Sequence, residues 1–136
     1  MKTVFVDSNI FMYAAGKAHA HKEPSVRFLL RIAEGDMQAV TSCEVLQEII
    51  YRYWSIKEQD IGMRIVDHII ALIPAILPVT RADILRAKEL LIQSPTITPR
   101  DALHAAVMLR HQIPTICTFD KHFDRIDGIK RLTPQP

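Results

Sequence analysis

The chain has 136 residues, 49% of them hydrophobic, and a formal net charge of +2. This length fits a single domain, residues 1–136, with one substantial core, and the composition is that of an ordinary globular protein. No stretch approaches the roughly 20 apolar residues of a membrane span and the N-terminus shows no secretion signal, so we expect a cytoplasmic protein with no membrane association.

The first half of the chain alternates between strand-like and helix-like segments. The apolar run Val4-Phe5-Val6 indicates a short buried strand. We expect a strand at 2–6, a short helix at 8–13, a polar loop at 17–23, a helix at 24–34, a strand at 38–41, and two further helices that begin near residues 42 and 58.

The second half continues the alternation. We expect a strand within 74–80, helices at about 81–93 and 99–111, a strand at 115–119 and a last short strand at 130–133. Pro78 predicts an edge position or a bend for the first of these strands. Strands separated by helices imply right-handed crossovers, so the pattern predicts an α/β fold with a mostly parallel sheet covered on both faces.

Several carboxylates of this chain end a strand or open a helix. Asp7 follows the first strand, Asp120 follows the strand at 115–119, and Asp101 stands in the first turn of the helix at 99–111. Acids in such places can converge on one edge of a parallel sheet. Because a cluster of hard oxygen ligands repels itself, its natural occupant is a divalent cation. The sequence therefore predicts a metal-dependent enzyme.

Each acid also has a simpler interpretation. Asp7 is a good cap for the helix that follows it, and Asp101 completes a capping-box pattern with Thr98. Glu48 lies at the margin of the buried face of its helix, four residues before Arg52, with which it can form a surface ion pair.

The turn after the strand at 115–119 is equally open to two interpretations. Asp120 and Asp124 there are either metal ligands or parts of a solvated loop, and His122 is either a surface residue, a substrate contact or a general base. Thr118 can donate a hydrogen bond to a neighbouring carboxylate. With these five acids set apart, 17 Lys and Arg face ten remaining acids, which suits a polyanionic substrate.

Four stretches together closely resemble the motifs of PIN-domain ribonucleases, and most of all the VapC-type toxins of toxin–antitoxin pairs. They are Val-Phe-Val-Asp7-Ser-Asn-Ile, Ser-Cys-Glu-Val-Leu-Gln-Glu48, Thr-Pro-Arg-Asp101-Ala-Leu-His-Ala-Ala and Ile-Cys-Thr-Phe-Asp120-Lys-His-Phe-Asp124. The resemblance implies a three-layer α/β/α sandwich, Mg²⁺ or Mn²⁺, endoribonuclease activity on RNA, an antitoxin partner and a homodimer. It makes Asp7, Glu48, Asp101 and Asp120 the metal-binding acids, whereas Asp124 matches an acid found in only part of the family.

Two rival functions remain from the residues themselves. A phosphatase of the haloacid-dehalogenase type also has a first strand that ends in Asp, but such enzymes carry Asp-x-Asp there and this chain has Asn9 in the second place. A PIN-like module that only binds RNA or protein is the other. Basic residues near the motifs are candidates for RNA contacts: Arg100, Lys121 and Arg125, with Arg52 less certain.

Two further expectations concern packing. Cys43 and Cys117 have no metal-ligand spacing and are expected to be buried, reduced thiols. The helix that begins at Ser42 ends in an aromatic cluster, and the next helix adds more apolar residues: Tyr51, Tyr53, Trp54, Ile61, Met63 and Ile65. Either all of these pack internally, or the helix pair forms a homodimer interface or a groove for an inhibitory peptide.

Overall fold

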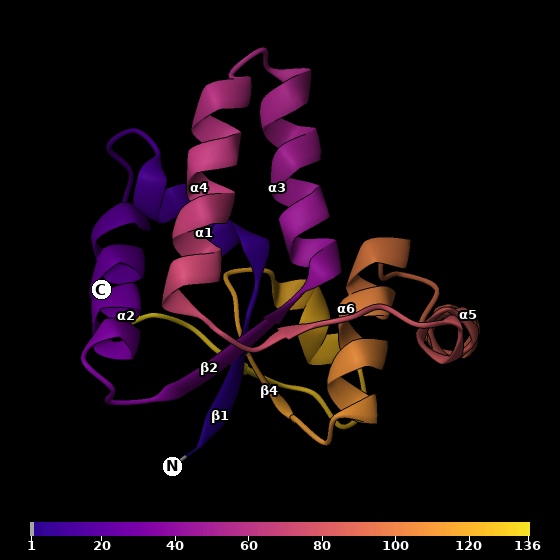
Figure 1. Ribbon diagram of the computed structural model, residues 1–136. Helices are drawn as coiled ribbons and strands as arrows, with labels where there is room; N and C mark the ends of the chain where they lie inside the picture. Colours follow the sequence, from indigo (N-terminus) through magenta and orange to yellow (C-terminus); the bar gives the residue numbers. More distant parts are fainter. Residues whose placement is uncertain (1) are drawn as a thin grey trace.

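The computed structural model describes residues 2–136 and contains five strands within a set of helices (Figure 1). The strands are β1 (Thr3–Val6), β2 (Gln38–Ser42), β3 (Ile76–Leu77), β4 (Thr115–Cys117) and β5 (Lys130–Leu132). The helices are α1 (Ser8–Ala15), α2 (Lys22–Ala33), α3 (Cys43–Ser55), α4 (Gln59–Leu72), α5 (Arg81–Gln93), α6 (Pro99–Arg110) and the 3₁₀ helix η1 (Lys121–Arg125).

All strand pairs are parallel, and the strand order is β3-β2-β1-β4-β5. The chain therefore moves outward from β1 in one direction through β2 and β3, then returns to the other side of β1 for β4 and β5. Crossovers of one hand that move in opposite directions place their helices on opposite faces. One group of helices is accordingly α1 to α4, and α5 with α6 forms the other. The predicted three-layer α/β fold is confirmed.

The strand order reverses between the neighbouring strands β1 and β4. Open parallel sheets bind ligands at the carboxyl ends of the strands beside such a point. In Figure 1, α1 and α3 begin at the carboxyl ends of β1 and β2, and the loops around this edge bring the end of β4 beside them. The topology alone thus collects the acids that follow the strands.

Capping side chains fix where the helices begin. The Ser42 hydroxyl accepts a hydrogen bond from the Val45 N–H at 3.4 Å, and the Thr98 hydroxyl accepts one from the Asp101 N–H at 3.1 Å. Thr80 and Asp83 form a reciprocal capping box at the start of α5. Asp83 also pairs with Arg110 at 2.7 Å, which joins α5 to the end of α6.

Most element boundaries agree with the sequence patterns, and the differences have local causes. β3 is the short edge strand that Pro78 predicts. β4 ends at Cys117, two residues before the predicted end, and the Thr118 side chain that follows bonds to Asp7 and Asn9. α2 begins two residues earlier than predicted, at Lys22.

The core lies between the sheet and both helix layers, and small residues control how closely α6 approaches. Ala102, Ala105 and Ala106 are almost completely buried. Their short side chains let the helix lie close to the sheet, which carries Asp101 toward the strand ends. The expectation for the cysteines is correct for Cys117, which is buried, and wrong for Cys43, which is exposed because it stands at the solvent side of the first turn of α3.

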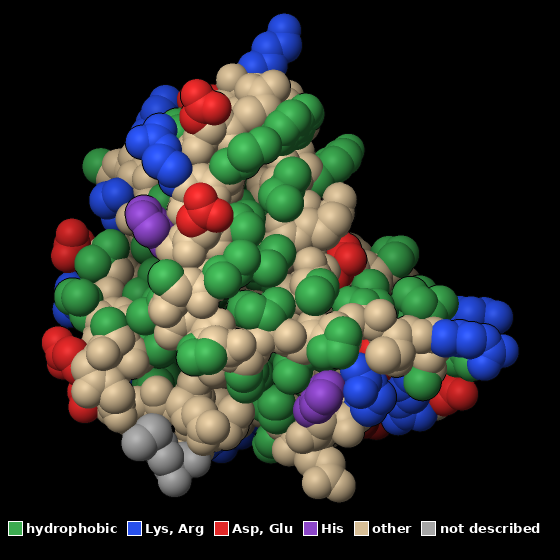
Figure 2. All heavy atoms as spheres, in the orientation of Figure 1, with side chains coloured by type: hydrophobic (Ala, Val, Ile, Leu, Met, Phe, Trp, Pro, Cys, Tyr) green, Lys and Arg blue, Asp and Glu red, His purple; other side chains and the backbone are tan. Residues whose placement is uncertain are grey.

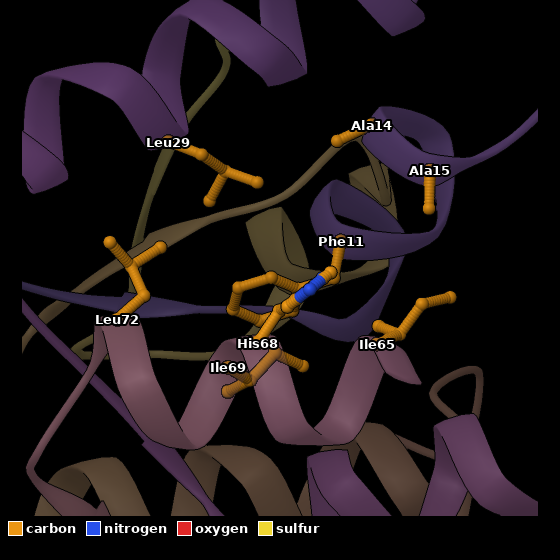
Figure 3. A pocket seen from close by; sticks show the side chains of 8 residues that line it. All are labelled: Phe11, Ala14, Ala15, Leu29, Ile65, His68, Ile69 and Leu72. Atoms are coloured by element: carbon orange, nitrogen blue, oxygen red, sulfur yellow. The ribbon is translucent and has the colours of Figure 1, made fainter. Parts of the chain in front are cut away.

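A small apolar cavity of about 210 Å³ lies between α1, α2 and α4. Figure 3 shows Phe11, Leu29 and Ile69 pointing into it from the three helices. Within residues 2–136, none of the helices has both the length and the hydropathy that crossing a bilayer requires.

Candidate active site

Asp7 stands at the end of β1 and is only 5% exposed. One carboxylate oxygen, Oδ1, caps α1 by accepting the Ser8 N–H at 2.7 Å, so the predicted capping role is real. The other oxygen, Oδ2, accepts the Thr118 hydroxyl at 2.7 Å. Capping does not account for that second contact, which comes from the end of a different strand.

Thr118 and Asn9 tie the ends of β1 and β4 together. The Thr118 hydroxyl donates to Asp7 and accepts from Asn9 Nδ2 at 2.9 Å and from the Asp120 N–H at 3.0 Å. A hydroxyl has one donor and two acceptor positions, so this one is fully used. The Asn9 side-chain oxygen, Oδ1, in turn accepts a hydrogen bond from the Phe119 N–H at 3.4 Å. These bonds hold Asp7 and Asp120 in fixed positions relative to each other.

Glu48 points from α3 toward a buried histidine of α6. His104 Nε2 lies 3.2 Å from Glu48 Oε1 and 3.8 Å from Asp7 Oδ1, and the histidine is 1% exposed. Glu48 also lies 3.7 Å from Arg100, so its ion pair is with α6 and not with Arg52, which was the alternative interpretation.

His104 is the residue that the sequence interpretation missed. It stands three residues after Asp101, a spacing that places both on one face of the helix. A histidine among the small residues Ala102, Ala105 and Ala106 was the available signal. It was not decisive, because only the fold shows that Glu48 and Asp7 lie opposite that face.

His122, in η1, lies beside both Asp101 and Asp120. Its Nδ1 lies 3.1 Å from Asp120 Oδ1 and 3.9 Å from Asp101 Oδ2. Asp101 Oδ2 is buried and has no hydrogen-bond partner. A helix cap alone would not leave a buried carboxylate oxygen in this state, because an unsatisfied buried acceptor is costly.

The carboxylates have divergent proton affinities. Burial and the neighbouring charges of Asp120 and Asp7 raise the pKa of Asp101 to about 6. Burial also raises the pKa of Asp7, although His104 and Thr118 oppose the shift. Burial acts in the same direction on Glu48, but the hydrogen bond with His104 and the charge of Arg100 outweigh it and lower the pKa of Glu48. Burial therefore acts on all three carboxylates, and repulsion from two neighbouring acids adds to it at Asp101.

The acids open into a cleft of about 620 Å³ between the α3 and α6 sides of the sheet edge, lined by Glu48, Thr98, Pro99, Arg100, Asp101, Asp120 and His122. The potential ligand atoms fall into two trios, and within each trio they lie within 4.8 Å of one another. One trio is Asp7, Glu48 and His104, and the other is Asp101, Asp120 and His122. The structure thus brings together four of the five predicted acids.

Asp124 is the predicted acid that lies apart. It forms two bonds with Arg131, at 3.0 and 3.1 Å, and belongs to neither trio. The side chain is half exposed and the guanidinium lowers its pKa. In this arrangement Asp124 connects η1 to β5.

Comparison with known proteins places the chain in a family. The chain matches the PIN domain over residues 4–129. The chain belongs to the PIN-domain family. This PIN domain is 43% identical to ribonuclease VapC13 of Mycobacterium tuberculosis and to VapC ribonuclease Mb1869c of Mycobacterium bovis, over 95% of this chain and 98% of each relative. It is 35% identical to ribonuclease VapC23 of Mycobacterium tuberculosis, over 86% of this chain and 92% of the relative.

Solved structures share the fold of this PIN domain at lower identity. VapBC2 from Rickettsia felis, bound to a DNA fragment from its promoter, aligns with a TM-score of 0.76 and 21% identity over 96% of this chain and 98% of that one. VapC20 of Mycobacterium tuberculosis, a toxin that cleaves the sarcin-ricin loop, aligns with a TM-score of 0.73 and 18% identity, over 86% and 89% of the two chains.

Proposed function

We propose that this PIN domain is an endoribonuclease that depends on Mg²⁺ or Mn²⁺ and is the toxin of a toxin–antitoxin pair. The observation that carries the proposal is the pair of ligand trios at one edge of the sheet, drawn from β1, α3, α6 and the segment after β4. The VapC ribonucleases that it resembles over nearly their whole length support the same activity.

The residues present fit a divalent cation. Each trio offers two carboxylates and an imidazole, and the buried, unpartnered Asp101 Oδ2 is a free hard donor. A carboxylate-rich set suits Mg²⁺ or Mn²⁺ better than softer metals, and no described cysteine joins either trio. A bound cation there would supply an activated water and stabilise charge on the phosphoryl oxygens.

The protein's own groups would position and exchange protons. His104, buried between Glu48 and Asp7, fixes the direction of both carboxylates. His122 has a 46% exposed side chain and uses Nδ1 toward Asp120 and Asp101, which leaves Nε2 to give a proton to the leaving oxygen. Asp124 would act by fixing the turn through Arg131, in place of the metal-ligand role suggested by the resemblance.

Basic residues around the cleft would hold RNA. Arg100 lines the cleft and is 44% exposed, and Lys121 and Arg125 belong to η1, which follows Asp120 directly. Cations beside an acidic metal site attract phosphates next to the scissile one.

A partner surface is proposed on the α3–α4 pair. Trp54 is 47% exposed, and Tyr51 and Met63 are also exposed, so the alternative that the whole cluster packs internally is wrong; Tyr53 and Ile65 alone are buried. Hydrophobic side chains gather over these helices in Figure 2. We place a homodimer contact there, with the antitoxin as the second partner. VapBC complexes among the structural neighbours support an antitoxin.

A cleavage assay tests the proposal. Purified protein with Mn²⁺ or Mg²⁺ should cut single-stranded RNA, and chelator should stop it. D7N should lower the rate at least 100-fold while the thermal melt remains cooperative, because the amide keeps the shape of Asp7 but loses its charge. D67N, an exposed acid on α4, is the matched control and should cleave normally.

The rival functions give different results in the same assay. Phosphate release from a small monoester without RNA cleavage would identify a phosphatase. RNA binding without cleavage under any divalent metal would identify a non-catalytic module.

A further inference from the structure

A second cleft, of about 490 Å³, adjoins the acid cluster and has no part in the chemistry proposed above. Asn9 lies at the boundary, since it lines this cleft and its Nδ2 is 3.4 Å from Asp7 Oδ2. The remaining walls come from the end of α1, the loop after it and the end of α3. A volume of this size accommodates a small organic ligand.

Two rings that line the cleft, Tyr13 and His19, belong to a connected series of four rings. Phe119 and His21 stack face to face, with centroids 3.8 Å apart and planes 10° apart. Tyr13 meets His21 edge-on at 5.0 Å and meets His19 at 4.7 Å. Tyr13 and His19 line the cleft and His19 is exposed, so its ring is the solvent end of the series.

Hydrogen bonds hold these rings in place. His19 Nδ1 accepts the His21 N–H at 2.9 Å, and Lys22 Nζ donates to the Ala14 and Gly16 carbonyls at the end of α1. The inner end of the series is Phe119, the residue directly before Asp120. Its backbone N–H donates a hydrogen bond to the side-chain oxygen of Asn9. The series of rings is therefore rigidly connected to the strand end that carries the acids.

Positive charge comes from the end of α3 and from the loop that also carries His19. Arg52 and Lys17 line the cleft and are exposed, and Glu58 is the opposing acid there. Exposed aromatic rings combined with cations along a groove are the features that bind single-stranded nucleic acid, in which bases stack on the rings and phosphates meet the cations. Met12 and Ile56 also line the cleft, but the two rings and the two cations combine a stacking surface with phosphate-binding charge, and this combination favours a nucleotide.

We propose that this cleft binds an unpaired nucleotide of the RNA next to the scissile phosphate, with its base stacked on His19 and Tyr13 and its phosphate held by Arg52 and Lys17. This assignment rests on the ribonuclease function proposed above. Every base has a π face, so the subsite tolerates any base but requires one that is not in a duplex. The subsite would select single-stranded loops through shape.

Two labelled probes separate base stacking from phosphate binding. The first is an eight-nucleotide oligouridylate, and the second is an oligomer of the same length with abasic riboses. By fluorescence anisotropy in chelator, H19A should bind the oligouridylate about tenfold more weakly and the abasic oligomer unchanged. H19F should restore binding because it keeps a ring. R52A should weaken both probes and lower the salt slope by about one.

His68 provides the matched control, since it is an exposed histidine on α4 that faces the separate apolar cavity. H68A should bind both probes like the wild type. In Mn²⁺-dependent cleavage, H19A should raise KM about tenfold without changing kcat. If the wild type does not cleave RNA but still binds the oligouridylate through its bases, that result would contradict the proposed function and support the subsite.

Equal affinity of H19A and wild type for the oligouridylate, with an unchanged KM, would overturn the nucleotide assignment. The expected occupant of the cleft would then be a protein segment.

Discussion

At the scale of single residues, two features describe the electrostatics of the site. One is the buried His104, and the other is the Asp101 oxygen Oδ2, which has no hydrogen-bond partner. His104 supplies a donor to Glu48 and lies beside Asp7, so two carboxylates of the cluster already have a neutralising neighbour. Asp101 Oδ2 has no hydrogen-bond partner, and His122 Nδ1 lies 3.9 Å from it. Burial and the charges of Asp120 and Asp7 raise the pKa of Asp101 to about 6, so the fold disfavours its ionised form.

The D101N substitution tests this distribution of charge. A folded-state pKa above the unfolded value means that ionised Asp101 destabilises the fold above about pH 6, and that the penalty disappears as pH falls toward 4. In chelator at pH 7.5, D101N should therefore be more stable than wild type, by about 1 to 2 kcal/mol after the loss of a charge favourable to the helix N-terminus. Added Mn²⁺ should stabilise it less than the wild type.

Thermal melts at pH 7.5 and pH 4, with chelator and with Mn²⁺, measure these differences. If Asp101 serves only the helix, the variant would instead be less stable in chelator and would respond to Mn²⁺ like the wild type.

At the scale of elements, the closeness of α3 and α4 depends on one glycine. A methyl group at Gly62 would lie 2.6 Å from the Tyr53 Cβ, and both residues are buried. Because Tyr53 is fixed through its own backbone in α3, the contact cannot be relieved by rotation of a flexible chain end. Gly62 thus sets the distance between the two helices that carry the exposed aromatic surface.

The G62A substitution should lower the free energy of unfolding by about 1 to 3 kcal/mol, even though alanine is the better helix former. R64A, at an exposed position two residues further along α4, should change it by less than about 0.5 kcal/mol. Urea unfolding of both variants gives the comparison. A stabilised G62A would show that the helices can separate without cost.

The elements themselves follow from local patterns, whereas parts of the site do not. Apolar periodicity and capping residues predict the helices and strands, and acids after strands predict a shared edge. His104 and the Asp124–Arg131 pair were not predictable, because α3 lies over α6 and β5 lies beside η1 only in the fold. The exposure of Cys43 depends likewise on which side of α3 meets the sheet.

At the scale of the whole molecule, the acid cluster and the exposed aromatic residues of the α3–α4 pair lie in different regions. The acid cluster lies at the carboxyl ends of β1 and β4, where Glu48 of α3 and Asp101 of α6 join it, and the α3–α4 pair extends away from the sheet with its exposed aromatic residues (Figures 1 and 2). Exposed hydrophobic patches of this kind mark protein contacts.

A homodimer through the α3–α4 pair should be sensitive to charge at Trp54. W54D should shift the protein toward the monomer in sedimentation equilibrium, because a carboxylate at the centre of an apolar contact loses its hydration. I92D, which alters the 81% exposed Ile92 of α5, should leave the dimer intact. A wild type that stays monomeric at high concentration would rule out this interface.

The central claim is that the carboxylates at this edge hold the metal that RNA cleavage requires. Its most direct test is to follow Mn²⁺ binding and RNA cleavage in one titration series on wild type, D7N and D67N. We expect wild type and D67N to bind Mn²⁺ and to cleave over the same concentration range, and D7N to lose both together while remaining folded. Cleavage by the wild type in chelator, or full activity of D7N, would contradict the account.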